Sequence, residues 1–208
     1  MLNELINRYP QLSMCADALE AATAAIINCY RNGGKILLCG NGGSCADCDH
    51  IVGELMKGFL KKRQLSNEQK AIMINNSPLL DEETLNKLQG GLPAISLPSI
   101  PVLNSAFCND VDPELIYAQS LLALGKKNDI LIAMSTSGNA KNVYAAAQVA
   151  KGIGMTVIAL TGKSGGLLKA AVDICISVPE TETFKVQELH LPVYHYLCAA
   201  VEEHFFAE

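Results

Sequence analysis

Lys35-Ile-Leu-Leu-Cys-Gly-Asn-Gly-Gly-Ser44 is the stretch that decides the fold, and a helical pattern carrying His50 and Glu54 follows it. An apolar run, a glycine-rich turn and a helix start, in that order, are how a parallel sheet presents backbone N–H groups to an anion. The four-residue step from His50 to Glu54 places an imidazole and a carboxylate on one helix face. The stretch therefore predicts a phosphate cradle beside an acid–base or metal-binding pair.

The composition is that of a single domain with a full core. The chain has 208 residues, 50% of them hydrophobic, which is enough to bury such a core. Its net charge of -5 argues against a broad basic surface for nucleic acid. The short basic cluster at 61–63 does not change this, and we expect it in a solvated helix end or loop. No signal peptide is recognised, and no apolar run approaches the about 18 residues of a membrane span. We therefore expect a cytoplasmic protein with neither membrane nor nucleic acid as partner.

Eight cysteines are many for a chain of this length. Most fall inside expected strands and helices, as small buried residues of a protein in a reducing compartment do. Cys45 and Cys48 form a CxxC pair, a spacing also used in redox and zinc sites. Because no second CxxC exists and the pair directly follows a glycine turn, we expect these cysteines to pack under the loop.

The N-terminal residues 2–31 predict two helical pieces broken near Pro10. Apolar residues recur at spacings of three and four along them, which is a long apolar stripe. The stripe consists of Leu12, Cys15, Leu19, Ala22, Ile26 and Cys29. It must pack on the sheet or on another subunit, and the sequence does not choose between them.

Short apolar strands alternate with helices from residue 35 onward. We expect strands at 36–38, 93–97, 129–134, 156–160 and 174–177. We expect helices at 44–59, 112–124, 139–151, 165–171 and 185–206, the first capped by Ser44. This alternation predicts an α/β fold of three layers, with a five-stranded parallel sheet flanked by helices. Ligands of such sheets bind at the carboxyl ends of the strands.

Residues 60–92 break this rhythm. A connection of that length inside a domain is either a functional excursion or disorder. We interpret it as an insertion near the active site of an otherwise single domain spanning 1–208.

A second loop, Ser135-Thr-Ser-Gly-Asn139, follows the third strand as Gly40–Ser44 follows the first. Its hydroxyls can donate to phosphate oxygens, and Gly138 lets the backbone approach a ligand. Neither loop has the lysine of a P-loop or the spacing of a dinucleotide fingerprint. Two such loops in one chain favour a small phosphorylated ligand.

The last helix adds Gln187 and His195, eight residues apart and near one face, although Glu188 could also align with His195. Together with His50 and Glu54, His195 completes both a zinc-ligand set and an acid–base set. We expect His190 and His204 to be structural or solvated.

The order and spacing of these motifs resemble the phosphoheptose isomerase family, which belongs to the sugar isomerase (SIS) family of domains. The resemblance covers nearly the whole chain except 60–92. It is carried by Cys39–Ser44, His50, Glu54, Asn109-Asp110, Ser135–Asn139, Leu160–Lys163, Val186–His190 and His195.

The resemblance implies a role for each matched position. It implies conversion of sedoheptulose 7-phosphate to D-glycero-D-manno-heptose 7-phosphate through an enediol, with Glu54 as base and His195 as acid. It implies a zinc site formed by His50, Glu54, Gln187 and His195. It further implies N-terminal oligomerisation helices and a homotetramer with shared active sites. The implied substrate-binding residues are Asn41, Gly42, Gly43, Glu54, Asn109, Asp110, Ser135, Thr136, Ser137 and Gln187.

Three departures from the family pattern leave the sugar open. Ala140 stands where a serine is common, Lys185-Val186 replaces Arg-Ile, and 60–92 adds length. An isomerase for a different sugar phosphate is therefore one alternative. The other is a non-catalytic SIS protein that binds a partner, like the replication-initiator-associating protein DiaA. DiaA resembles the family but lacks the residues corresponding to Glu54 and His195, which this chain has.

Overall fold

The five expected strands form one parallel sheet in the computed structural model, which describes residues 1–207. Their order in the sheet is β2-β1-β3-β4-β5, so the first strand lies second from the edge. The strands are β1 (Ile36–Gly40), β2 (Ala94–Ser96), β3 (Ile130–Ser135), β4 (Thr156–Thr161) and β5 (Ile174–Ser177). The carboxyl ends of β1 and β3 are neighbours, with Gly40 in register with Met134. The two glycine-containing loops therefore leave the sheet side by side.

Both faces of the sheet are buried, which explains the continuous apolar strands. Ile36 and Leu38 belong to the core on one face, and Leu37 and Cys39 to the core on the other. Side chains of a strand alternate between faces, so a strand buried on both sides has no polar positions. The fold is the predicted three-layer α/β architecture.

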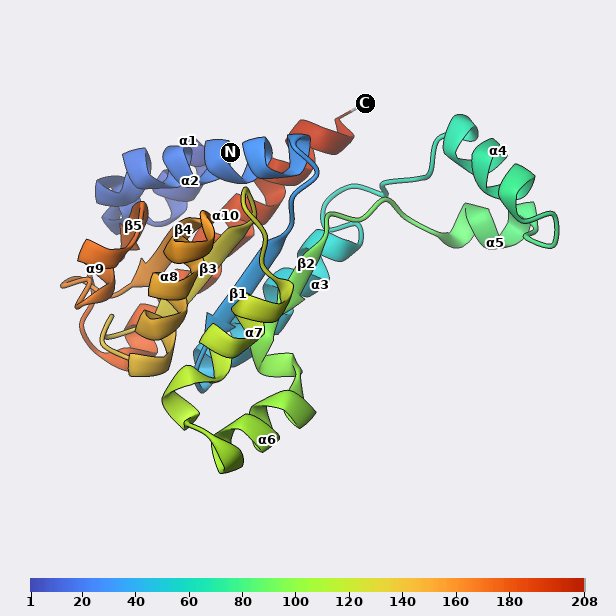
Figure 1. The fold of residues 1–208 in the computed structure, drawn as a ribbon. Coiled ribbons are helices and arrows are strands. Elements are labelled where there is room, and N and C mark those ends of the chain that lie inside the picture. Colours follow the sequence, from blue (N-terminus) through green and yellow to red (C-terminus); the bar gives the residue numbers. More distant parts are fainter. Residues whose placement is uncertain (208) are drawn as a thin grey trace.

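Helices cover the two faces unequally (Figure 1). One face carries α1 (Leu2–Arg8), a 3-10 turn (Pro10–Cys15), α2 (Ala16–Arg31), α3 (Gly43–Met56) and α10 (Thr183–Phe206). The other carries α7 (Ile116–Leu124), α8 (Lys141–Ile153) and α9 (Leu168–Ala171). The helices that follow the glycine-containing loops, α3 and α8, thus lie on opposite faces.

The N-terminal stripe packs within its own chain. Leu12, Leu19 and Ile26 are buried in the core shared with α10 and the sheet. The stretch Pro10–Arg31 is long and apolar enough for a membrane span by length and composition. Its stripe residues are buried against the sheet and α10, whereas Met14 on the same stretch is exposed. The stripe is therefore not free for another subunit, and any oligomerisation through these helices uses their other face.

Several helix starts differ from the sequence prediction, those of α3 and α8 next to the two loops among them. Gly42, with a φ of 56°, occupies the N-cap of α3, and Ser44 is buried inside its first turn. The expectation of a Ser44 cap was wrong because the tight turn needs a positive φ, which glycine adopts freely. The helix expected from Asn139 begins at Lys141, with Ala140 at its N-cap.

A helix at α6 (Pro101–Asp110) was not predicted, because none of its residues is buried and no apolar period marks it. The cysteine expectation is confirmed in part. All eight cysteines are free, and Cys48 packs in the core with its sulfur 3.9 Å from that of Met134. Cys108 is exposed on α6.

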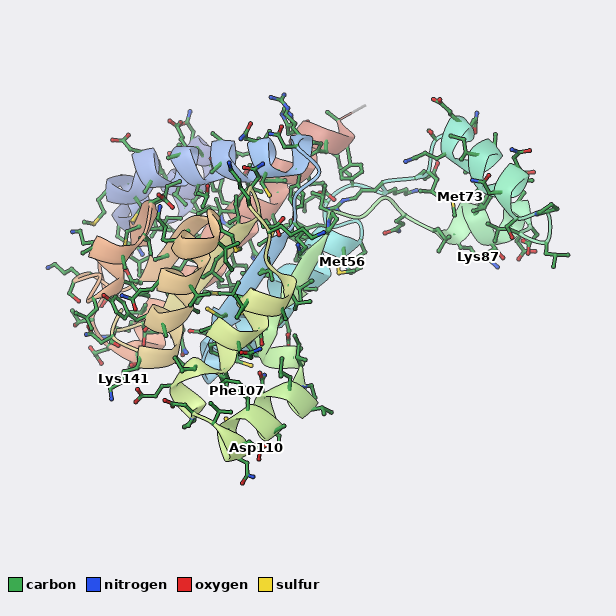
Figure 2. The ribbon with its side chains drawn as sticks, in the orientation of Figure 1. Met56, Met73, Lys87, Phe107, Asp110 and Lys141 are labelled. Carbon is green, nitrogen blue, oxygen red and sulfur yellow. The ribbon has the colours of Figure 1, made fainter. Side chains whose placement is uncertain are left out.

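Residues 60–92 form an ordered arm rather than a disordered connection. The arm carries α4 (Asn67–Asn76), which starts with a capping box of Ser66 and Gln69, and α5 (Glu82–Lys87). Figure 2 shows Met73 and Lys87 on this arm, apart from the body that contains the sheet. Within these two helices Leu85 is the one buried residue. The arm helices therefore extend away from the sheet of their own chain.

Candidate active site

The first loop is held by side chains that sequence reasoning missed. The hydroxyl of Tyr117 lies 2.8 Å from the Gly40 carbonyl oxygen and 3.1 Å from Oδ1 of Asn41. The amides of Asn41 and Asn142 pair through two hydrogen bonds of 2.8 and 3.0 Å. Asn41 is thus oriented from α7 and α8, and its loop is preformed.

Gly43 brings Gln187 to this loop. A Cβ at Gly43 would overlap the side-chain nitrogen of Gln187 and lie 2.9 Å from its Cδ. A side chain at this position would displace the Gln187 amide from its place above the first turn of α3. The structure therefore brings together Asn41, Gly42, Gly43 and Gln187, the positions for which the family resemblance implies substrate binding.

The second loop is built to present hydroxyls beside the first. Ser135 is buried at the end of β3, whereas Ser137 is exposed. The backbone N–H of Asn139 donates to Oγ of Ser137 (3.1 Å). Gly138 has a φ of 70°, and a Cβ there would overlap the Gly165 carbonyl. The segment after β4 thus supports this loop, and a Cβ at Gly166 would in turn overlap the Ser137 carbonyl.

Asn109 and Asp110 stand apart from the loops at the end of α6. The Asn109 amide donates to Asp110 Oδ1 (2.8 Å), and both residues are exposed. Within residues 1–207 no hydrogen bond joins either side chain to the two loops. Figure 2 shows Asp110 at the tip of α6.

A second cluster lies between α3 and α10. Nε2 of His50 is 3.2 Å from Oε1 of Glu54, as the four-residue spacing predicted. Nδ1 of His50 is 2.9 Å from the Tyr194 hydroxyl, which donates to Oδ1 of Asp47 (3.2 Å). The His195 ring centroid lies 5.1 Å from that of His50. Asp47 and Tyr194 carried no motif in the sequence and become visible only through this contact.

The hydrogen bonds of Tyr194 determine which nitrogen of His50 faces Glu54. A hydroxyl has one proton, so while Tyr194 donates to Asp47 it can only accept from Nδ1 of His50. Nε2 of His50 is then directed at the Glu54 carboxylate and can hold a second proton or a cation. Tyr194 and Asp47 thus orient the imidazole, as a hydrogen bond to one ring nitrogen sets the role of the other.

Three polar atoms in this cluster are buried without a hydrogen-bond partner in the described chain: Oδ2 of Asp47, Oε2 of Glu54 and Nε2 of His195. Burial lowers the pKa of His195, and the neighbouring His50 lowers it further, although Glu54 opposes both effects. His195 is therefore a neutral imidazole near pH 7. Unpartnered buried polar atoms are costly, so a carboxylate oxygen and an imidazole nitrogen left free here indicate a functional site.

The two clusters lie at different heights along the helices. Gln187 and His195 are eight residues apart, which is about 12 Å along α10 at 1.5 Å per residue. Gly43 and Glu54 are eleven residues apart, or about 16 Å along α3 by the same rise. The Gln187 side chain lies against Gly43 at the start of α3, so the structure places it with the first loop. Within residues 1–207 no three His, Cys, Asp or Glu side chains are placed to hold a metal ion.

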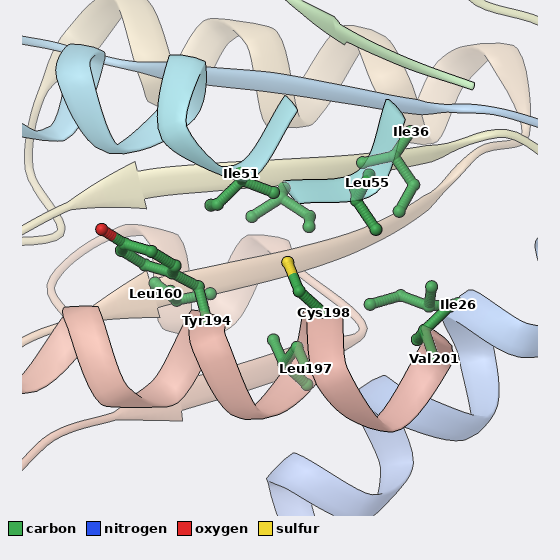
Figure 3. A pocket seen from close by; sticks show the side chains of 10 residues that line it. Ile26, Ile36, Ile51, Leu55, Leu160, Tyr194, Leu197, Cys198 and Val201 are labelled. Carbon is green, nitrogen blue, oxygen red and sulfur yellow. The ribbon is translucent and has the colours of Figure 1, made fainter. Parts of the chain in front are cut away.

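A groove of about 420 Å³ opens beside His195. Leu5, Tyr9, Phe59 and Leu191 are among its apolar walls, and Arg8 adds a charge. A second cavity, shown in Figure 3, is an apolar packing void of about 10 Å³ between α3, α10 and the sheet. That void is at the lower limit for a single water, so it is no ligand site. The groove therefore borders the His195 side chain, whose Nε2 is itself buried.

Comparison with known proteins identifies the fold and its relatives. The SIS domain family matches residues 3–91 and 86–162. A phosphoheptose isomerase of Roseiflexus sp. (strain RS-1) is 36% identical over 193 residues, covering 93% of this chain and 85% of its own length. The structure of a phosphoheptose isomerase from Francisella tularensis superposes with a TM-score of 0.75 at 30% identity, covering 97% of this chain and 96% of that one. The enzyme of the same name from Neisseria gonorrhoeae gives 0.76 at 28% identity, with 97% and 94% covered.

Proposed function

Since the chain belongs to the SIS-domain family, and within it is a sugar-phosphate isomerase of the phosphoheptose isomerase group, we propose that it converts sedoheptulose 7-phosphate to D-glycero-D-manno-heptose 7-phosphate. The observation that carries this proposal is the cluster between α3 and α10. There Oε2 of Glu54 and Nε2 of His195 are buried with no partner in the described chain. The names of the relatives support the substrate, and the free atoms support the reaction.

Aldose–ketose isomerisation moves a proton between adjacent carbons through an enediol. Glu54 has the free carboxylate oxygen that a base needs to abstract this proton. His195, kept neutral by burial, can donate its N–H to the neighbouring oxygen as charge develops there. Each positioned acid or base contributes on the order of 10² to 10⁴ in rate.

The two loops divide the binding of the substrate. The hydroxyls of Ser135, Thr136 and Ser137 hold the phosphate, where charged oxygens accept strong hydrogen bonds. Asn41, Gly42, Gly43 and Gln187 line the sugar. Asn109 and Asp110 contribute from the exposed end of α6, which therefore moves or meets another subunit when substrate binds.

A homotetramer with shared active sites completes this arrangement in our proposal. The support is the distance of about 12 Å between Gln187 and His195 along one helix. In such a tetramer, Asn41, Gly42, Gly43 and Gln187 of one subunit face Glu54 and His195 of a neighbouring subunit, so the two sets line one active site. The groove beside His195 is the opening through which a neighbour would reach it.

Subunit mixing tests the shared site. Gly43→Ala and Glu54→Gln damage different clusters, so each homo-oligomer should be nearly inactive. Mixed oligomers that share sites should regain part of the wild-type activity, because some sites combine two intact clusters. Mixtures that stay as inactive as the separate variants would contradict sharing.

We propose zinc as the cofactor from the donor types alone, since within residues 1–207 no three His, Cys, Asp or Glu side chains are placed together to hold a metal ion. Two imidazole nitrogens, from His50 and His195, and a carboxylate oxygen from Glu54 are ligands that zinc prefers. We propose that Gln187 joins them from a neighbouring subunit. A bound zinc would polarise the substrate carbonyl as a Lewis acid. Elemental analysis of protein purified without chelator tests this, with His50→Ala expected to lower the zinc content.

The turnover assay separates the proposal from its alternatives. Purified protein is incubated with sedoheptulose 7-phosphate and with shorter ketose phosphates, and aldose formation is followed. Fastest turnover of the seven-carbon substrate supports the proposal. Preference for another sugar would favour the alternative suggested by Ala140 and the arm. Absence of any turnover would favour the partner-binding alternative.

The free cysteines agree with a cytoplasmic location.

A further inference from the structure

Arg63 is a buried arginine where the sequence predicted a solvated basic cluster. Its side chain is 0% exposed, and its backbone has a φ of 45°. It lies at the root of the arm, where its carbonyl accepts from the Gly90 N–H (2.7 Å). A positive φ is strained for a residue with a side chain, so the surrounding contacts must hold Arg63 in place.

The guanidinium of Arg63 binds the end of α3. Nη1 donates to the Leu55 carbonyl (2.6 Å) and Nη2 to the Glu54 carbonyl (2.9 Å). The last four carbonyls of a helix lack partners inside it, so α3, which ends at Met56, needs such donors. A cation is also favoured at a helix C-terminus by the helix dipole. Arg63 therefore holds the last turn of α3 in place. One of its two contacts is with the backbone carbonyl of Glu54, the proposed base.

The same guanidinium binds α10. Nε donates to Oε1 of Glu202 (2.7 Å), and the Glu202 side chain is 1% exposed. Glu202 also accepts from the backbone N–H groups of Phe59 (2.8 Å) and Leu60 (2.7 Å). Although burial alone would raise the pKa of Glu202, these amides and Arg63 lower it, so the carboxylate is charged. The guanidinium also lies over the Phe206 ring, 4.7 Å from its centroid.

We propose that Arg63 is a positioning residue for the isomerisation, which joins the helix carrying Glu54 to the helix carrying His195. Glu202 lies seven residues, or two turns, beyond His195 on α10. The planar guanidinium binds two carbonyls of α3 and one carboxylate of α10 at the same time. It therefore fixes the position of α3 along α10 and the rotation of the two helices relative to each other. This inference rests on the proposed roles of Glu54 and His195.

The arm is attached at the same point. Gln64 pairs with Gln89 in an antiparallel bridge next to Arg63. We call Arg63, Glu202 and the carbonyls of Glu54 and Leu55 the Arg63 clamp. The two chain segments that connect the arm to the rest of the domain thus both pass next to this clamp. A displacement of the arm root would act on Glu54 through this clamp.

The test removes the clamp without leaving a buried charge. In Arg63→Met/Glu202→Met both charges are replaced by apolar side chains, an exchange that buried ion pairs often tolerate. We expect a folded protein whose kcat falls at least tenfold while KM changes less than threefold. Arg63→Lys keeps the charge but lacks the fork, so its kcat should also fall. Lys35→Met/Asp129→Asn removes another buried ion pair at the amino ends of the strands, and its kcat should stay within twofold of wild type.

Amide hydrogen exchange gives a readout that does not depend on turnover. Residues 51–58 should exchange faster in Arg63→Met/Glu202→Met than in wild type, because the end of α3 has lost both guanidinium donors. The Leu55 carbonyl keeps the Leu92 N–H as its donor (2.9 Å). A folded double variant with wild-type kcat and wild-type exchange in 51–58 would overturn the inference. If wild type itself shows no turnover, the proposed function fails, whereas the exchange result still decides whether Arg63 holds α3.

Discussion

Replacing His190 should reduce the amount of unfolding free energy that the protein loses between neutral and acidic pH. His190 is fully buried on α10. Burial lowers its pKa from 6.5 to about 4, although the Thr161 backbone opposes the shift. The folded protein therefore contains a neutral histidine that the unfolded chain would protonate below pH 6.5.

The magnitude follows from linkage between proton binding and folding. Because the folded pKa is depressed, the unfolded chain binds the proton first, and stability falls as the pH decreases from 6.5 toward 4. At about 1.4 kcal/mol per pKa unit, the full effect of this one residue is about 3 kcal/mol. Between pH 7 and pH 4.5 about 2 kcal/mol of it should be lost.

The assay is urea unfolding at pH 7 and pH 4.5 at one protein concentration, since subunit association would otherwise alter stability. In His190→Leu the loss of unfolding free energy between these pH values should be about 2 kcal/mol smaller than in wild type. His204→Gln, which removes an exposed histidine of the same helix, serves as the control and should follow wild type. Equal losses in His190→Leu and wild type would refute the reasoning.

Further predictions concern the two loops. Gly43→Ala should lower kcat/KM at least tenfold, because its Cβ would displace the Gln187 amide, whereas Gly53→Ala on the same helix meets nothing within 4 Å and should remain active. Steady-state kinetics of both variants checks this, and equal activities would contradict the packing of Gln187 on Gly43. Ala140→Ser places a capping hydroxyl at the N-cap of α8 and should stabilise the protein by about 0.5–1 kcal/mol, measured by urea unfolding. A destabilised Ala140→Ser variant would argue against the cap geometry.

The sheet could be predicted because its strands are buried on both faces. Runs such as Ile130–Met134 have no polar position, which is typical of parallel strands between helix layers. The contact between His50 and Glu54 could also be predicted, because residues four apart lie on one face of a helix. Periodicity identifies the face of a helix on which a residue lies but not its position along the helix axis. Gln187 and His195 lie on one face of α10, yet their backbone positions are about 12 Å apart along the axis. This is why residues grouped by sequence fall into two clusters in the structure.

The remaining site depends on contacts between distant parts of the chain. Arg63 and Glu202 are 139 positions apart, and no local pattern marks either as buried. Tyr194 and Asp47 likewise meet across 147 positions. The α6 helix escaped prediction because it buries nothing, so no apolar period records it. Its exposed Asn109 and Asp110 were recognisable only through the family resemblance.

The central claim is that Glu54 moves the proton between the two carbons. Sedoheptulose 7-phosphate is incubated with the enzyme in D₂O, and NMR follows both aldose formation and deuterium entering the sugar. Wild type should form aldose and incorporate deuterium, whereas Glu54→Gln should lose both activities by at least a hundredfold while remaining folded. A folded Glu54→Gln variant that isomerises the sugar at the wild-type rate would contradict the claim.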